Sequence, residues 1–129
     1  MLILNASGGL EKDKPADYAM QLNSTAQVRL VEMALPLMPR GGRIIFVTSH
    51  MAHFYREKPV YGPYEPVAAS KYAGERALRA RGAEFEMRGI AADAAFNAEK
   101  TAQPYSLGVR NDEAAVRAAM INDRSIDHK

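Results

Sequence analysis

The chain contains no cysteine among its 129 residues. Disulfide bonds, catalysis by a thiolate and cysteine-based zinc sites are therefore excluded. No apolar run approaches the roughly 20 residues that a membrane-spanning helix needs. The apolar start of the chain ends after four residues at Asn5, which does not fit a signal peptide. We therefore expect a cytoplasmic protein that has no membrane partner.

The chain also has little net charge, because 17 basic residues face 15 acidic ones and leave a formal charge of +2. The basic residues are scattered singly, so we expect no nucleic-acid partner. Hydrophobic residues make up 47% and charged residues 25%, which is typical of a soluble globular protein. The length corresponds to about one domain.

Two short apolar runs predict buried strands. The first is Met1–Leu4, and the second is Arg43–Ser49, whose β-branched and aromatic residues are continuous, as in a parallel strand covered on both faces. Between them, apolar residues recur at helical spacing over 17–35, with Asp17 as a suitable N-cap. Strand, helix and strand at this spacing predict a βαβ unit with a right-handed crossover.

A long loop with several tyrosines is expected over 50–66, followed by a second helix over 66–81, on which Glu75 is spaced to pair with Arg79. The alanine-rich residues after Ile90 form strands poorly, so the parallel sheet is expected to contain two or three strands. The sequence thus divides into a βαβα unit over 1–90 and a mostly helical or irregular tail over 91–129.

Polar residues follow both predicted strands. Asn5 and Ser49 should lie at the same edge of the sheet, because ligands of open parallel sheets bind at the carboxyl ends of the strands. Lys71, early on the second helix, could reach that edge. Each has a plainer interpretation: Asn5 could cap a turn, Ser49 could end a strand, and Lys71 could be a solvated helix lysine. His50 and His53 are three residues apart without a third ligand, so no metal site is expected.

Four motifs occur in a recognisable order: an Asn-Ala turn after a strand, an Asn in the next helix, a Gly-x-Ile-Ile strand ending in Ser, and Ser-Lys early on a helix. They lie at Asn5-Ala6, Asn23, Gly42–Ser49 and Ser70-Lys71. Over roughly residues 1–90 this set resembles the short-chain dehydrogenase/reductase family. The resemblance implies an α/β fold, a partial Rossmann-like doubly wound parallel sheet that lacks its N-terminal strands.

The resemblance also implies roles for these residues. In that family a Tyr hydroxyl is the general acid/base, a Lys lowers the pKa of that Tyr and binds the nicotinamide ribose, a Ser binds the substrate carbonyl, and a helix Asn holds a relay water. The catalytic candidates are therefore Ser49, Lys71 and Asn23. The cofactor-binding candidates are Asn5, Ala6 and Lys71.

The sequence departs from the family pattern in the position of the Tyr. Val67 stands four residues before Lys71, where the family has its acid. The nearest upstream tyrosine, Tyr64, is seven residues before Lys71, which is two helical turns, and we take it as the candidate acid. Pro66 opposes this assignment, because the residue before a proline is biased away from helix.

The family's glycine-rich phosphate loop is absent, and Gly8-Gly9 cannot replace it because no helix follows directly. Two hypotheses follow. The first is an NAD- or NADP-dependent oxidoreductase acting on a small carbonyl or alcohol, incomplete or inactive as this chain, which binds either that cofactor or none. The alternative is a non-catalytic remnant or interaction module that keeps the βαβ scaffold. Under either, the resemblance implies a homo-oligomer that forms through helices 17–35 and 66–81.

Overall fold

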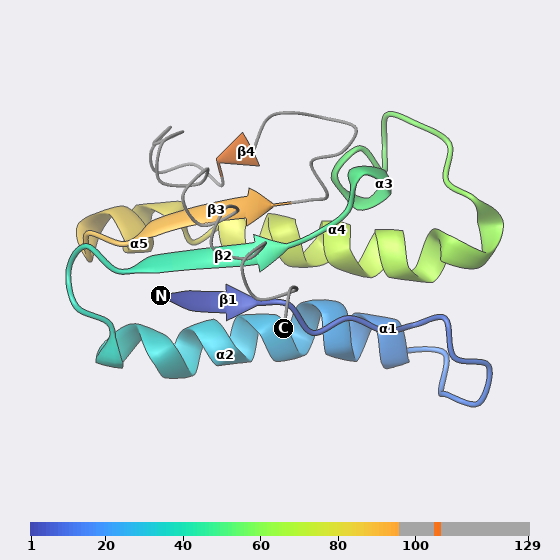
Figure 1. Cartoon of the computed structure of the whole chain (residues 1–129), viewed down its shortest axis with the longest axis horizontal. Helices are drawn as coiled ribbons and strands as arrows, with labels where there is room; N and C mark the ends of the chain where they lie inside the picture. Colours follow the sequence, from blue (N-terminus) through green and yellow to red (C-terminus); the bar gives the residue numbers. More distant parts are fainter. Residues whose placement is uncertain (96–104, 107–129) are drawn as a thin grey trace, which may run out of the picture.

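A computed structural model of the chain describes residues 1–95 and 105–106. Within them the chain forms one four-stranded sheet with the strand order β1-β2-β3-β4 (Figure 1). The first three strands are parallel, and the last pairs antiparallel with the third. The strands are β1 (Leu2–Leu4), β2 (Arg43–Val47), β3 (Ala91–Ala95) and β4 (Tyr105–Ser106). This confirms the predicted α/β class and a partial Rossmann-like arrangement.

The first helical stretch agrees with the prediction for 17–35. It runs through α1 (Tyr18–Met20), a π-helical turn (Gln21–Thr25), α2 (Ala26–Ala34) and a 3₁₀ turn (Leu35–Leu37). Asp17 stands at the N-cap position but makes no capping hydrogen bond. The chain leaves helical geometry at Met38, two residues after Pro36.

The segment between β2 and the second long helix is more regular than the predicted loop. It contains α3 (His50–His53) and a 3₁₀ turn (Gly62–Tyr64). Ser49 makes α3 possible, because its hydroxyl accepts a hydrogen bond from the Ala52 N–H at 3.1 Å and so caps the helix.

The second long helix is α4 (Glu65–Arg79), followed by α5 (Gly82–Met87). It begins one residue earlier than predicted. Glu65 is helical, with φ −54° and ψ −47°, although it precedes Pro66. The bias against helix before proline is therefore overcome here, because the 3₁₀ turn leads directly into α4.

A third parallel strand, which the sequence left open, follows Ile90. Ala91–Ala95 forms β3, which pairs with β2 from Arg43↔Ala91 to Val47↔Ala95. Alanine is a weak strand former in isolation, but pairing and packing decide the outcome inside a sheet. The rest of the predicted tail, residues 96–104 and 107–129, lies outside the described residues.

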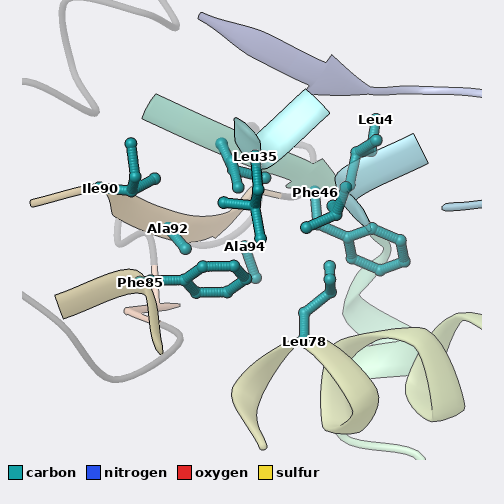
Figure 2. Packing of buried hydrophobic residues seen from close by; sticks show 10 residues of the cluster. Leu4, Leu35, Phe46, Leu78, Phe85, Ile90, Ala92 and Ala94 are labelled. Atoms are coloured by element: carbon teal, nitrogen blue, oxygen red, sulfur yellow. The ribbon is translucent and has the colours of Figure 1, made fainter. Parts of the chain in front are cut away.

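The core lies on one face of the sheet, where side chains of alternate strand residues meet the helices. Figure 2 shows Leu35, Leu78 and Phe85 directed from the helical segments toward the strand residues. The fully buried cluster is Leu4, Val31, Leu35, Ile44, Phe46, Leu78, Phe85, Ile90, Ala92 and Ala94. Since α2, α4 and α5 all contribute to this cluster, they cover the same face. The carboxyl ends of the three parallel strands point toward α3 and the start of α4, as Figure 1 shows.

Candidate functional site

The turn after β1 is fixed by the side chain of Asn23, which lies in the π-helical turn and is 1% exposed. Its Nδ2 donates to the Gly8 carbonyl at 2.8 Å and to Ser70 Oγ at 2.9 Å, and its Oδ1 accepts from the Gly8 N–H at 3.1 Å. Ser70 in turn donates to the Val67 carbonyl at 2.9 Å. One amide thus joins the β1 turn, the first helical stretch and α4.

A second buried amide, that of Gln27, fixes the same turn and was not predicted from the sequence. Its Nε2 donates to the Ala6 carbonyl at 3.2 Å and to the Leu22 carbonyl at 3.1 Å. Its Oε1 has no partner among the described residues. Asn23 and Gln27 are four residues apart, so two amides on an otherwise apolar helix face were the available signal. Asn5 and Ala6 are exposed, and the backbone of their turn is held by hydrogen bonds from Asn23 and Gln27.

Lys71 is buried, with 5% of its surface exposed, which excludes the interpretation as a solvated helix lysine. Its Nζ donates to the carbonyl of Val47, the last residue of β2, at 3.3 Å. Burial lowers the pKa of Lys71 from its ordinary value, and the nearby Glu75 carboxylate partly offsets this. The structure thus brings Lys71 to the strand end that is followed by Thr48 and Ser49.

Ser49 is half-buried at this strand end. Its oxygen already accepts the α3 capping bond, but a hydroxyl keeps one donor and a second lone pair. Beside it, Thr48 is 5% exposed, and its Oγ1 has no hydrogen-bond partner among the described residues. The carboxyl end of β2 therefore presents two hydroxyls and, from α4, one ammonium.

The structure gives weaker support to a tyrosine as the general acid. Tyr64 is half-buried at the start of α4, and no hydrogen bond of its hydroxyl occurs in the part of the chain described. The structure places Tyr64 neither in hydrogen-bond contact with Lys71 nor with Ser49. The Tyr55 hydroxyl donates to the Glu65 carboxylate, which raises the pKa of Tyr55.

Glu75 is a further buried residue whose contact was not predicted. Instead of pairing with Arg79, its Oε2 accepts a hydrogen bond from His53 Nδ1 at 2.9 Å, across 22 residues of sequence. The Glu75 residue is 3% exposed, and its Oε1 has no partner within residues 1–95. No group of three metal-ligating side chains is found over the described ranges, and no helix there is long and apolar enough to cross a membrane.

Comparison with known proteins gives matches among solved structures only. No family model matches the sequence, and no match is found among curated proteins. The promiscuous reductase LugOII, which catalyses keto-reduction in lugdunomycin biosynthesis, is 24% identical with a TM-score of 0.59 over 74% of this chain and 42% of its own.

Two further structures show the same likeness. The landomycin C-6 ketoreductase LanV, solved with NADP and rabelomycin, is 30% identical with a TM-score of 0.55 over 72% of this chain and 38% of its own. The enoyl-[acyl-carrier-protein] reductase (NADH) of Aquifex aeolicus VF5 is 22% identical with a TM-score of 0.58, over 88% of this chain and 46% of its own.

The chain therefore spans less than half the length of each of these reductases. The shared fold over this segment confirms the resemblance to short-chain dehydrogenases/reductases that the sequence predicted.

Proposed function

We propose that this chain carries the substrate and nicotinamide side of an NAD- or NADP-dependent oxidoreductase that acts on a small carbonyl or alcohol. The observation that carries the proposal is the buried Lys71 ammonium bonded to Val47 O, two residues before Ser49. A buried ammonium is costly and is retained where its charge is used. The likeness to three reductases, two of them ketoreductases by name or stated reaction, supports the same class of chemistry.

The residues present fit the nicotinamide end of such a cofactor. Asn5 and Ala6 are exposed on a turn that two buried amides hold in place. Lys71 has three N–H donors, of which the Val47 carbonyl takes one. In this proposal Asn5, Ala6 and Lys71 hold the nicotinamide ribose, and the bound cofactor supplies the hydride. Titration with NADH and with NADPH distinguishes the two cofactors.

Within the proposal, Ser49 donates its hydroxyl proton in a hydrogen bond to the substrate carbonyl oxygen. Tyr64 is assigned the general acid, and the positive charge of Lys71 favours its phenolate form. Asn23 is assigned to the proton relay by resemblance, although its amide also fixes the β1 turn. A cytoplasmic location belongs to the same proposal.

The proposal is tested by titrating the chain with NADH and with NADPH while following cofactor fluorescence. Saturable binding of either cofactor is the expected result, and Lys71→Ala should abolish it. Lys12→Ala is the matched control, since Lys12 is exposed in the loop before α1 and should leave binding unchanged. An absence of binding at millimolar cofactor, or equal binding by Lys71→Ala, would reject the proposal.

A second candidate function, an interaction module, is favoured by one surface. Leu30, Met33 and Leu37 follow one another at helical spacing on α2 and the turn after it, and are 46%, 72% and 84% exposed. We assign this stripe to self-association through helices 17–35 and 66–81. Analytical ultracentrifugation should show a dimer that Met33→Glu dissociates. A monomeric wild-type chain would rule this out.

A further inference from the structure

Glu75 occupies a position that the oxidoreductase chemistry assigned above does not use. It stands one helical turn after Lys71 on α4, so the two side chains emerge on the same side of the helix. Both residues are almost completely buried, at 3% and 5% exposure. The negative charge of the Glu75 carboxylate raises the affinity of the Lys71 ammonium for its proton, and it opposes the effect of desolvation on Lys71.

The Glu75 carboxylate is held from a second element. His53, the last residue of α3, donates from Nδ1 to Glu75 Oε2 at 2.9 Å, and the His53 side chain is only 11% exposed. The other oxygen, Oε1, has no hydrogen-bond partner among the described residues. Glu75 therefore retains acceptor capacity that its histidine partner does not use.

A cavity of about 510 Å³ lies beside Glu75 and His53, which both line it. Its other lining groups carry mixed charge, with an acid from the turn after α3 and two bases from α4. The lining residues include His53, Glu57, Tyr72, Glu75, Arg76 and Arg79. From β2 the Val47 carbonyl accepts a hydrogen bond from Lys71 Nζ.

We propose that Glu75 is a positioning residue for Lys71, whose buried ammonium it keeps charged, while His53 fixes the carboxylate. The arrangement matters because Lys71 acts on a cofactor and a phenol only as a cation. The inference rests on the proposed function for its catalytic meaning, but the link between Glu75 and Lys71 is a property of the protein alone.

The link is measured by NMR titration of the whole chain labelled with ¹³C at lysine Cε, with Lys71→Met identifying the Lys71 signal. Glu75→Gln keeps the shape of the side chain and removes its charge, so the midpoint of the Lys71 titration should move to lower pH. Each pH unit of movement is a tenfold loss of proton affinity. Glu57→Gln is the matched control, because it removes an exposed carboxylate from the same cavity and should leave the midpoint unchanged.

An unchanged Lys71 midpoint in folded Glu75→Gln would overturn the proposal. Glu75 would then only connect α3 and α4 through its hydrogen bond to His53. If Glu75→Gln does not fold, the wild-type chain labelled at glutamate Cδ decides: the Glu75 signal should shift at the pH where Lys71 loses its proton. Independent titration of the two signals also overturns the proposal. Cofactor fluorescence is read separately, so a moved Lys71 midpoint without cofactor binding rejects the proposed function and supports the positioning role.

Discussion

Gly74 lies where α4 packs against Asn23 and Phe46, and its replacement by alanine tests this packing. A Cβ at this position would be 2.8 Å from the Asn23 carbonyl oxygen and 2.9 Å from Phe46 Cζ. Real Cβ atoms do not come this close, so α4 would have to move. Neither neighbour yields easily, because one is backbone and the other is the ring of a phenylalanine that is 1% exposed.

Two opposing effects set the magnitude. Alanine is favoured over glycine inside a helix by about 1 kcal/mol. Overpacking a well-packed core costs about 1–3 kcal/mol, and the rigid neighbours of Gly74 place it in the upper part of that range. We therefore expect Gly74→Ala to lower the free energy of unfolding by about 1–2 kcal/mol.

Urea unfolding followed by circular dichroism measures this difference, with an unchanged slope showing that the two-state comparison holds. Gly62→Ala is the matched control, because a Cβ there meets nothing within 4 Å and φ is not positive. It should be neutral or stabilise the fold by up to about 1 kcal/mol. A Gly74→Ala chain as stable as wild type would refute the close approach of α4 to Asn23 and Phe46.

The remaining predictions concern the site. Asn23→Ala should cost about 3 kcal/mol, since groups of Gly8 and Ser70 lose three hydrogen bonds at about 1 kcal/mol each; a loss below 1 kcal/mol in urea unfolding would contradict it. Ser49→Ala should cost about 1 kcal/mol through the lost α3 cap, and Ser49→Thr should restore most of it. Burial lowers the folded-state pKa of Lys71 below the ordinary value of 10.5, so the unfolded chain binds more protons between the two values. Wild type should therefore gain stability relative to Lys71→Met as the pH rises toward 10.5, and parallel pH profiles would refute this.

The sequence predicted those helices and strands whose own residues form a recognisable apolar pattern. The run of β-branched and aromatic residues over Arg43–Ser49 identified β2, and apolar spacing identified the helices near 17–35 and 66–81. Some elements were not recognisable locally because they depend on contacts: Ala91–Ala95 is a strand through pairing with β2, and α3 depends on the Ser49 cap.

The candidate site was likewise predictable from the sequence only in part. Proximity of Lys71 to the β2 end followed from topology, but its burial did not, because burial depends on α3 and on residues far apart in sequence. The pairing of His53 with Glu75 spans 22 residues, and helical spacing pointed to Arg79 instead. The catalytic roles of Ser49, Lys71, Asn23 and Tyr64, and cofactor contacts at Asn5 and Ala6, stay predictions.

The amide of Asn23 couples the two sides of the site in a thermodynamic sense. It contacts Gly8 in the β1 turn and Ser70, the residue immediately before Lys71. A ligand that orders the turn therefore lowers the cost of ordering the start of α4, and a ligand held by Lys71 does the same for the turn. By linkage the two effects are equal, so under the proposed function the contacts that one cofactor makes at the turn and at Lys71 should reinforce each other rather than act independently.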